Sequence, residues 1–120
     1  MNHQSGRKKL NLNAAHRRSL IRNQAILFIT KGTLVTTKAR VKEVQRFTEK
    51  LVTLARQGNN FNTRRRAKAL LPYKDEALDK LFVEIAPRYV NRAGGYTRVI
   101  PLPRRISDTA VVAKLEWVIS

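Results

Sequence analysis

The sequence predicts an α+β domain in two layers, in which helices cover one face of a small three-stranded sheet. Four segments repeat apolar residues at helical spacing, and three short segments are rich in β-branched residues. Turn and helix-ending residues separate these segments in the order α-β-α-α-α-β-β. The length of 120 residues suits one domain, which we expect to span residues 13–120 behind a basic N-terminal extension over residues 1–12.

The extension, "MNHQSGRKKLNL", is polar and basic and offers almost nothing to a core. A segment of this composition cannot bury enough apolar surface to offset the entropy lost when it is ordered. We therefore expect residues 1–12 to be extended in the free protein and to become ordered only against a partner.

The first helix is expected to begin after Asn13, which can cap it, and to run to Lys31, where Gly32 stops it. Apolar residues at helical spacing define the side of this helix that faces the core. They are Leu20, Ile21, Ala25, Leu27 and Phe28. The β-rich segment "TLVTT", residues 33–37, follows as the first strand.

The second and third helices are both bounded by helix-ending residues. The second is expected over residues 38–57, and Gly58 ends it. Its buried stripe consists of Val44, Phe47, Leu51, Leu54 and Ala55. The third, "TRRRAKALL", covers residues 63–71, with Asn62 as its cap and Pro72 as its stop.

A fourth helix and two strands complete the predicted domain. The helix is expected over residues 75–86, where Pro87 closes it. Its apolar face consists of Leu78, Leu81, Phe82 and Ile85. The strands are "GYTRVIPL", residues 95–102, and "TAVVAKLEWVI", residues 109–119. In the last strand, alternate residues share one face: Thr109, Val111, Ala113, Leu115, Trp117 and Ile119.

The net charge of the chain points to its partner. The sequence contains 25 Lys and Arg against 8 Asp and Glu, a net charge of +17, and its first acidic residue is Glu43. A compact domain with this excess repels itself unless a polyanion compensates it. Nucleic acid is therefore the leading candidate partner, and an acidic membrane surface is the second. No apolar run approaches the ~20 residues of a membrane-spanning helix.

Groups that could carry catalysis or bind a metal are scarce. Cysteine is absent, and neither His3 nor His16 has an acidic residue near it in the sequence. Asp75, Glu76 and Asp79 could imitate a metal cluster on one helix face, but capping and compensation of the helix dipole explain them without a metal. No phosphate-binding loop or dinucleotide fingerprint occurs. We predict no enzyme activity, metal, cofactor or small-molecule substrate.

Basic side chains gather in short segments that suit phosphate binding. In "TRRRAK", residues 63–68, three consecutive arginines cover most of the circumference of a helix, and no acidic residue lies nearby in the sequence. This arrangement favours the clamping of phosphates over an ordinary solvated face. Arg18 and Arg22 lie one turn apart in the first helix, and Lys38, Arg40, Lys42 and Arg46 charge the early turns of the second.

The motif "RAGGYTR" combines bare backbone, positive charge and an aromatic ring. Gly94 and Gly95 can adopt positive φ angles and let the backbone approach a sugar-phosphate chain closely. Arg92 and Arg98 flank them and can pair with phosphates. Tyr96 either stacks on an unpaired base, covers the sheet edge, or belongs to the core of an ordinary glycine turn.

Seven segments in order resemble the family of bacterial large-subunit ribosomal protein seventeen. They are "SGRKKLN", "HRRSLIRN", "TTKARVKE", "LVTLAR", "NTRRRA", "KLFVEIAPRY" and "RAGGYTR", and the C-terminal "DTAVVAKLEWV" is similar to the last strand of the family. The resemblance covers nearly the whole chain. It implies a non-catalytic, structural protein of the large subunit that binds large-subunit ribosomal RNA near the peptide exit, beside neighbouring ribosomal proteins. The localisation expected is a cytoplasmic ribosome, with an organellar ribosome left open.

The resemblance also implies a set of RNA-binding residues. They are Ser5, Gly6, Arg7, Lys8, His16, Arg17, Arg22, Asn23, Lys38, Arg64, Arg65 and the turn formed by Arg92, Gly94, Gly95 and Arg98. On charge or ring chemistry we add Lys9, Arg18, Arg40, Lys42, Arg66 and Tyr96 to the predicted RNA-binding set.

Three other functions are weighed against this one. A free DNA- or RNA-binding regulator would place its cations on one recognition helix, whereas here they occupy four separate segments. An enzyme acting on RNA lacks candidate residues. A membrane-active protein would require a helix with an aromatic-rich apolar face.

Overall fold

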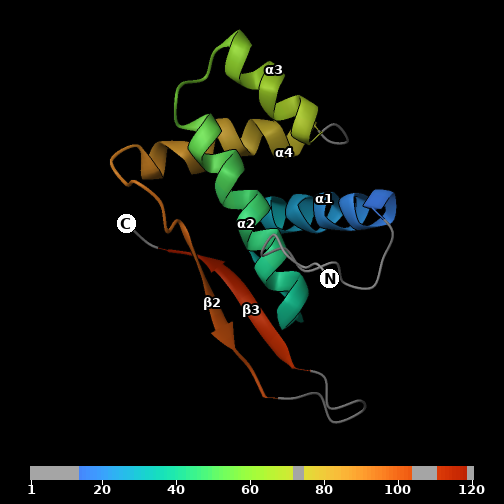
Figure 1. Cartoon of the computed structure of the whole chain (residues 1–120). Helices are drawn as coiled ribbons and strands as arrows, with labels where there is room; N and C mark the ends of the chain where they lie inside the picture. The colour runs from blue at the N-terminus through green and yellow to red at the C-terminus, as the bar shows by residue number, and fades with distance from the viewer. Residues whose placement is uncertain (1–13, 72–74, 104–110, 119–120) are drawn as a thin grey trace.

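Figure 1 shows the computed structural model of the chain, which describes residues 14–71, 75–103 and 111–118. The elements in chain order are α1 (Ala14–Lys31), β1 (Thr33–Thr37), α2 (Lys38–Ala55), α3 (Phe61–Leu70), α4 (Asp75–Lys80), η1 (Leu81–Ile85), η2 (Ala86–Tyr89), β2 (Thr97–Pro101) and β3 (Val112–Trp117). The α+β class and the order α-β-α-α-α-β-β are confirmed.

The three strands form one antiparallel sheet in the order β1-β3-β2. The C-terminal strand is therefore central, and its Leu115 lies opposite Leu34 of β1 and Val99 of β2. Helix α2 packs against all three strands, and Leu115 is fully buried beneath it. The other helices pack around α2 on the same side of the sheet (Figure 1).

Helix α1 has the predicted length, but one member of its predicted core face is wrong. Ile21, Ala25 and Phe28 are buried as expected, whereas Leu27 is 41% exposed. At about 100° per residue, Leu27 lies about 120° around the helix from Ile21 and points away from the sheet. Ile26 and Ile29 are buried instead and complete the core face.

Glycine residues end the first two helices with positive φ angles. Gly32 adopts a φ of +87°, and its amide donates to the carbonyl of Phe28 at 2.8 Å before β1 begins. Helix α2 ends at Ala55, two residues earlier than predicted, and Gly58 in the following turn has a φ of +137°. A left-handed residue after a helix is a common end, and glycine adopts it without strain.

The core face of α2 is confirmed with additions. Of the predicted stripe, Val44, Leu51 and Ala55 are buried, while Phe47 and Leu54 are half-buried and pack against the core. Val41, Thr48 and Val52 are also buried. Two neighbouring rows of α2 are covered because sheet and helices contact it from different sides.

The predicted cap of α3 is wrong by two residues. Asn60, not Asn62, caps the helix: its side chain accepts from the amide of Thr63 at 3.0 Å, and Thr63 Oγ1 accepts from the amide of Asn60 at 3.3 Å. Asn62 lies inside the helix and is exposed. The sequence offers three asparagines here, and only the reciprocal pair with Thr63 satisfies two helix-end amides at once.

Alanine at Asn60 is therefore expected to destabilise the protein by about 1 kcal/mol, since a helix cap of this type contributes about 0.5–2 kcal/mol. Alanine at Asn62 is the matched control and should change the free energy of unfolding by less than about 0.5 kcal/mol. Urea denaturation followed by circular dichroism measures both. An equal loss in the two variants would contradict the assignment of Asn60 as the cap.

The fourth helix extends past the proline that was expected to close it. After α4, the chain continues through the π-helical η1 and the 3-10 helical η2, so that Pro87 lies within a helical turn. Pro87 is tolerated because it occupies the first turn of η2, where its missing amide needs no partner. The predicted apolar face, Leu78, Leu81, Phe82 and Ile85, is buried throughout.

Both C-terminal strands are shorter than predicted. β2 begins at Thr97 because Gly95 adopts a φ of +64°, which an extended strand does not contain. In β3, Ala113 is buried as predicted, but Val111 precedes the strand and is 42% exposed. The predicted positions Thr109 and Ile119 lie outside the described residues.

An aromatic cluster joins α1, η2 and β3. The rings of Phe28 and Trp117 stack with centroids 4.4 Å apart, and Tyr89 lies 6.1 Å from Trp117. The hydroxyl of Tyr89 donates to the carbonyl of Val118 at 2.7 Å. Burial raises the pKa of Tyr89 above its ordinary value. This cluster fixes α1 against the sheet and so positions the basic residues that α1 carries.

Candidate nucleic-acid interface

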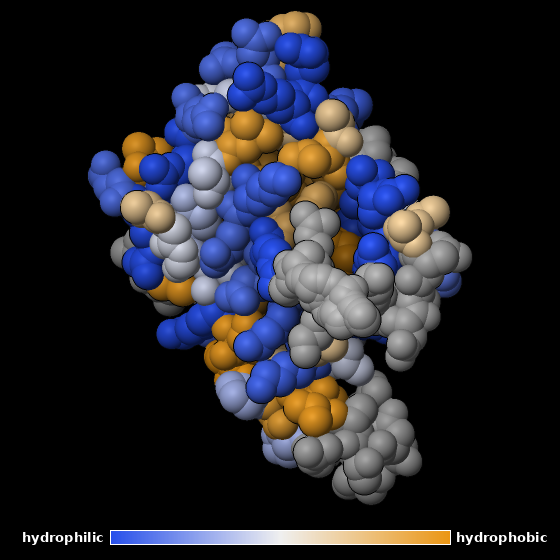
Figure 2. Space-filling view, viewed as in Figure 1, coloured by the Kyte–Doolittle hydropathy of each residue, from blue (hydrophilic) through white to orange (hydrophobic). Residues whose placement is uncertain are grey.

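Hydrophilic residues cover much of the face seen in Figure 2, above all its upper part over α3. Apolar residues show on this face as separate patches between them. Exposed cations on a chain of +17 net charge suit a polyanionic partner, because they lie where such a partner can reach them.

One basic cleft lies between α1 and α2, at the end of α3; we call it the α1–α2 cleft. It holds about 230 Å³ and is lined by Arg17, Arg18, Ile21, Arg22, Glu43, Arg46, Phe47, Lys50 and Leu70. Five cations therefore face a single carboxylate, and Arg46 lies 3.7 Å from that carboxylate of Glu43. The apolar floor keeps the cationic heads at the rim, where they can bind phosphates.

The cleft unites predicted and unpredicted residues. Arg17, Arg18 and Arg22 were predicted to bind RNA, and α2 adds Arg46 and Lys50 from across the cleft. The spacing of Arg46 and Lys50 by four residues places them on one face of α2, which was the signal available in the sequence. The sequence does not show that this face of α2 lies opposite the arginines of α1.

Both long helices begin with cations where acids would stabilise them. The first turn of α1 and that of α2 contain no acidic residue, and Lys38 and Arg40 occupy the first turn of α2. A cation near a helix N-terminus opposes the macrodipole and costs about 0.3–1 kcal/mol. Lys38 and Lys42 are exposed, as are His16 and Asn23 of α1. An anionic partner offsets the unfavourable placement of these cations.

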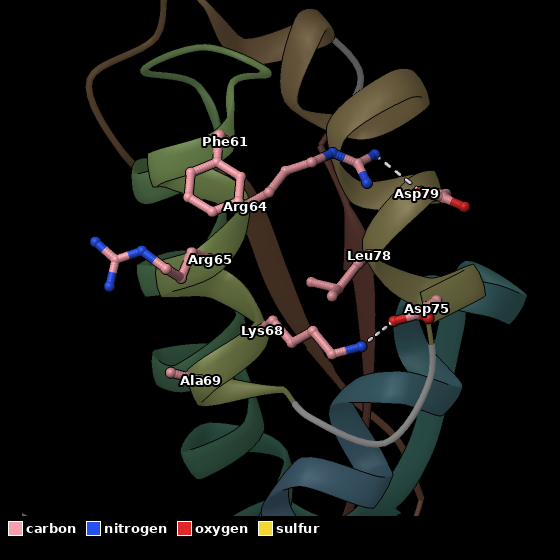
Figure 3. Close-up of a pocket in the computed structure, with 8 residues that line it drawn as sticks. All are labelled: Phe61, Arg64, Arg65, Lys68, Ala69, Asp75, Leu78 and Asp79. Atoms are coloured by element: carbon pink, nitrogen blue, oxygen red, sulfur yellow. Dashed lines mark hydrogen bonds and ion pairs between the residues drawn. The ribbon is translucent and has the colours of Figure 1, made fainter.

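A second depression lies between α3 and α4 (Figure 3); we call it the α3–α4 groove. Two ion pairs cross it: Arg64 Nη2 lies 2.9 Å from Asp79 Oδ1, and Lys68 pairs with Asp75. Arg64 also donates to Asn59 Oδ1 at 2.7 Å. No acid lies near these cations in the sequence, but two lie near them in the fold. Helix α4 folds back against α3 and brings two carboxylates that are 15 and 7 residues away in the sequence.

The three consecutive arginines of α3 thus have different surroundings. Arg64 is held by Asp79, and its guanidinium lies 5.1 Å from the centre of the Phe82 ring. Arg65 and Arg66 are exposed, and neither forms an ion pair with an acid of the described ranges. Figure 3 shows Arg65 pointing away from α4. Arg65 and Arg66 are therefore available to phosphates, while Arg64 mainly fixes α3 to α4.

The glycine turn, residues 92–96, adopts the backbone that its sequence predicts. Gly94 and Gly95 have φ angles of +132° and +64°. Arg92 Nε donates to their carbonyls at 3.2 and 3.1 Å, and the carbonyl of Arg92 accepts from Arg56. A Cβ at Gly94 would meet no atom within 4 Å, so the backbone there is open to a partner.

Comparison with known proteins now decides the family. The model of the family described as Ribosomal protein L17 matches residues 20–118, which include the α3–α4 groove, the glycine turn and the α1–α2 cleft apart from Arg17 and Arg18. The chain belongs to the ribosomal protein L17 family. It is similar to the large ribosomal subunit proteins bL17 of Akkermansia muciniphila (43% identity, 97% of this chain and 84% of the relative), Wolinella succinogenes (42%, 98% and 100%) and Gemmatimonas aurantiaca (38%, 100% of both).

As a member of the L17 family, the chain is a structural constituent of the ribosome and not an enzyme. Within the described ranges, no three His, Asp or Glu side chains lie together as metal ligands would. Asp75 and Glu76 occupy the first turn of α4, as dipole compensation predicts. No helix in the described part of the L17-family chain has the length and apolarity to cross a membrane.

The base-stacking alternative for Tyr96 is wrong in this L17-family chain. Its side chain is 1% exposed and packs 5.3 Å from the ring of Tyr89. Its hydroxyl lies 3.0 Å from both Thr53 Oγ1 and Arg56 Nη1. Tyr96 is therefore a core residue and cannot stack on a base.

Arg98 has a carboxylate partner on the neighbouring strand. Its Nε lies 2.7 Å from Glu116 Oε2, across β2 and β3. The hydrogen bond from Arg98 holds the pKa of Glu116 below its ordinary value. This stabilisation is therefore present at neutral pH and is lost as the pH falls through the lowered pKa. The side chain of Arg98 remains 58% exposed. It can therefore still contact a phosphate, although Glu116 neutralises part of its charge.

Five predicted RNA-binding residues of the L17-family extension, Ser5, Gly6, Arg7, Lys8 and Lys9, lie outside the described residues, as does the predicted cap Asn13.

Proposed function

We propose that this chain holds large-subunit ribosomal RNA in place through several separate basic sites and so supports assembly of the subunit. The α1–α2 cleft carries the proposal, because five cations from two helices converge on it against one carboxylate. Membership of the L17 family supplies the partners: ribosomal RNA and other proteins of the large subunit.

The remaining sites extend this surface. We include the exposed cations at the start of α2, Arg65 and Arg66 of α3, and the open backbone of the glycine turn. The basic extension over residues 1–12 belongs to the same proposal as a segment that RNA orders. Arginine suits these roles because its planar fork matches two phosphate oxygens at once.

The position near the peptide exit and the cytoplasmic location are also part of the proposal. The resemblance of the whole chain to its family supports them. Cross-linking of intact large subunits, with the cross-linked lysines mapped by mass spectrometry, tests the position. Cross-links only to proteins remote from the exit would contradict it.

Glutamine in place of Arg22 or Lys50 is expected to weaken RNA binding by about fivefold to tenfold. This is the effect of losing one phosphate contact that contributes roughly 1 kcal/mol to the binding free energy. The slope of log affinity against log salt should flatten by up to about one unit for each phosphate that is no longer bound. Filter binding to a large-subunit rRNA transcript at several salt concentrations measures both quantities.

Lys31→Gln provides the matched control, because Lys31 is an exposed cation at the opposite end of α1 and does not line the cleft. This substitution removes the same charge without touching the proposed phosphate sites. Equal salt slopes for wild type, Arg22→Gln and Lys50→Gln would show that the cleft does not bind phosphate. Thermal melts of all three variants confirm that each is folded.

A further inference from the structure

One exposed side chain has no role in the fold or in the sites above. Phe61, the first residue of α3, is 79% exposed and does not belong to the core cluster. Burial of a phenylalanine typically contributes about 1.5–3 kcal/mol, so leaving the ring in water forgoes that stabilisation. The capping pair of Asn60 and Thr63 fixes the backbone on both sides of Phe61, so the ring is presented from a rigid position.

Phe61 lines the α3–α4 groove, which holds about 570 Å³ between the two helices. The other lining residues are Arg64, Arg65, Lys68, Ala69, Asp75, Leu78 and Asp79. Figure 3 shows Arg64 and Lys68 reaching across the groove to their acids, with Leu78 between them. Each carboxylate of the groove is therefore neutralised by a cation, and its buried wall is apolar.

The chemistry of the groove changes from inside to rim. Inside the groove, each of the two acids is paired with a cation. At the rim, Arg65 is exposed and carries a charge with no described acid beside it. An aromatic ring beside a guanidinium group is the combination that binds an unpaired nucleotide, with the base stacked on the ring and the phosphate on the cation.

We propose that the α3–α4 groove binds one unpaired nucleotide of the ribosomal RNA, with its base stacked on Phe61 and its phosphate held by Arg65. The inference rests on the proposed function, since it names a base contact within the same RNA partner. A protein partner would bury Phe61 in an apolar pocket of its own, and the cations that line the groove together with Phe61 favour RNA over that alternative.

The shape of the side chain at position 61 tests the stacking. Phe61→Ala and Phe61→Leu should each weaken binding to a large-subunit rRNA transcript by about 5- to 150-fold, the range for removing one stacked base. Phe61→Trp should bind at least as tightly as wild type, because a larger flat ring stacks as well. Val83→Ala is the matched control: Val83 is 62% exposed on η1, outside the groove, and its truncation should change nothing.

Polyphosphate, a polyanion without bases, separates stacking from charge. Wild type and Phe61→Ala should bind polyphosphate with the same affinity, whereas Arg65→Gln should bind it more weakly. Lys31→Gln, at an exposed cation that lines neither the groove nor the cleft, should retain more affinity for the rRNA transcript than Arg65→Gln. Equal affinities of the Arg65 and Lys31 variants would overturn the assignment of the phosphate to Arg65.

Three results would overturn the stacking. One is a Phe61→Leu variant that binds the transcript as tightly as wild type. Another is an equal decrease in affinity in Val83→Ala. The third is a Phe61→Ala variant that binds the transcript normally but is missing from particles reconstituted with all large-subunit proteins, which would assign Phe61 to a protein contact. In each case wild type still binds the transcript, so the proposed function stands; failure of wild type to bind would instead overturn that function.

Discussion

Replacement of Phe28 by alanine is expected to destabilise the folded protein by about 3–5 kcal/mol, the usual cost of removing a buried phenylalanine. Phe28 is fully buried and stacks on Trp117, so that its truncation leaves a cavity between α1 and the sheet. Since small domains are stable by only about 5–15 kcal/mol, this is a large part of the total. Urea denaturation measures the decrease in stability, and Trp117, the only tryptophan of the chain, reports it by fluorescence.

Leu27 provides the control for this prediction, because it is the adjacent residue on the same helix and is 41% exposed. Leu27→Ala should change the free energy of unfolding by less than about 0.5 kcal/mol. If Phe28→Ala does not fold at all, Phe28→Leu keeps most of the volume and should lose less than about 1.5 kcal/mol. Equal destabilisation by Phe28→Ala and Leu27→Ala would contradict the described orientation of α1.

The second large effect concerns backbone strain at Gly95. Its φ of +64° lies in the left-handed region, and a Cβ there would meet only Arg92 Nη2, at 4.0 Å. Valine at this position should therefore cost about 1–3 kcal/mol through strain and not through collision. Asparagine, which tolerates the left-handed region, should cost clearly less than valine. Thermal melts of the free variants compare them.

Glycine variants also test whether the glycine turn only shapes the fold or also contacts RNA. If RNA approaches the open backbone, alanine at Gly94 should weaken binding to the rRNA transcript more than its effect on folding explains. The comparison is made at a temperature where every variant is folded. Normal binding by folded variants would leave the turn a purely structural role. A valine variant at Gly95 as stable as the asparagine variant would contradict the strain argument itself.

Local signals in the sequence located most of the elements. The predicted range of β1 and the end of α1 at Lys31 agree with the structure, and Gly94 and Gly95 have the positive φ angles expected of them. These features depend on a few neighbouring residues, whose conformational preferences act over one or two turns of chain. The same locality explains two of the misplaced ends: three asparagines compete for the cap of α3, and Pro87 is tolerated inside a helical turn.

The sequence by itself therefore determined the class of the fold, the order of its elements and the polyanionic character of the partner. Only the tertiary structure decided the strand order β1-β3-β2, the pairing of Arg64 with Asp79, the burial of Tyr96 and the meeting of Lys50 with the arginines of α1. Each of these joins residues far apart in the chain. Such contacts depend on how whole helices and strands pack, because the face that an element buries is fixed by its neighbours in space and not by its neighbours in sequence.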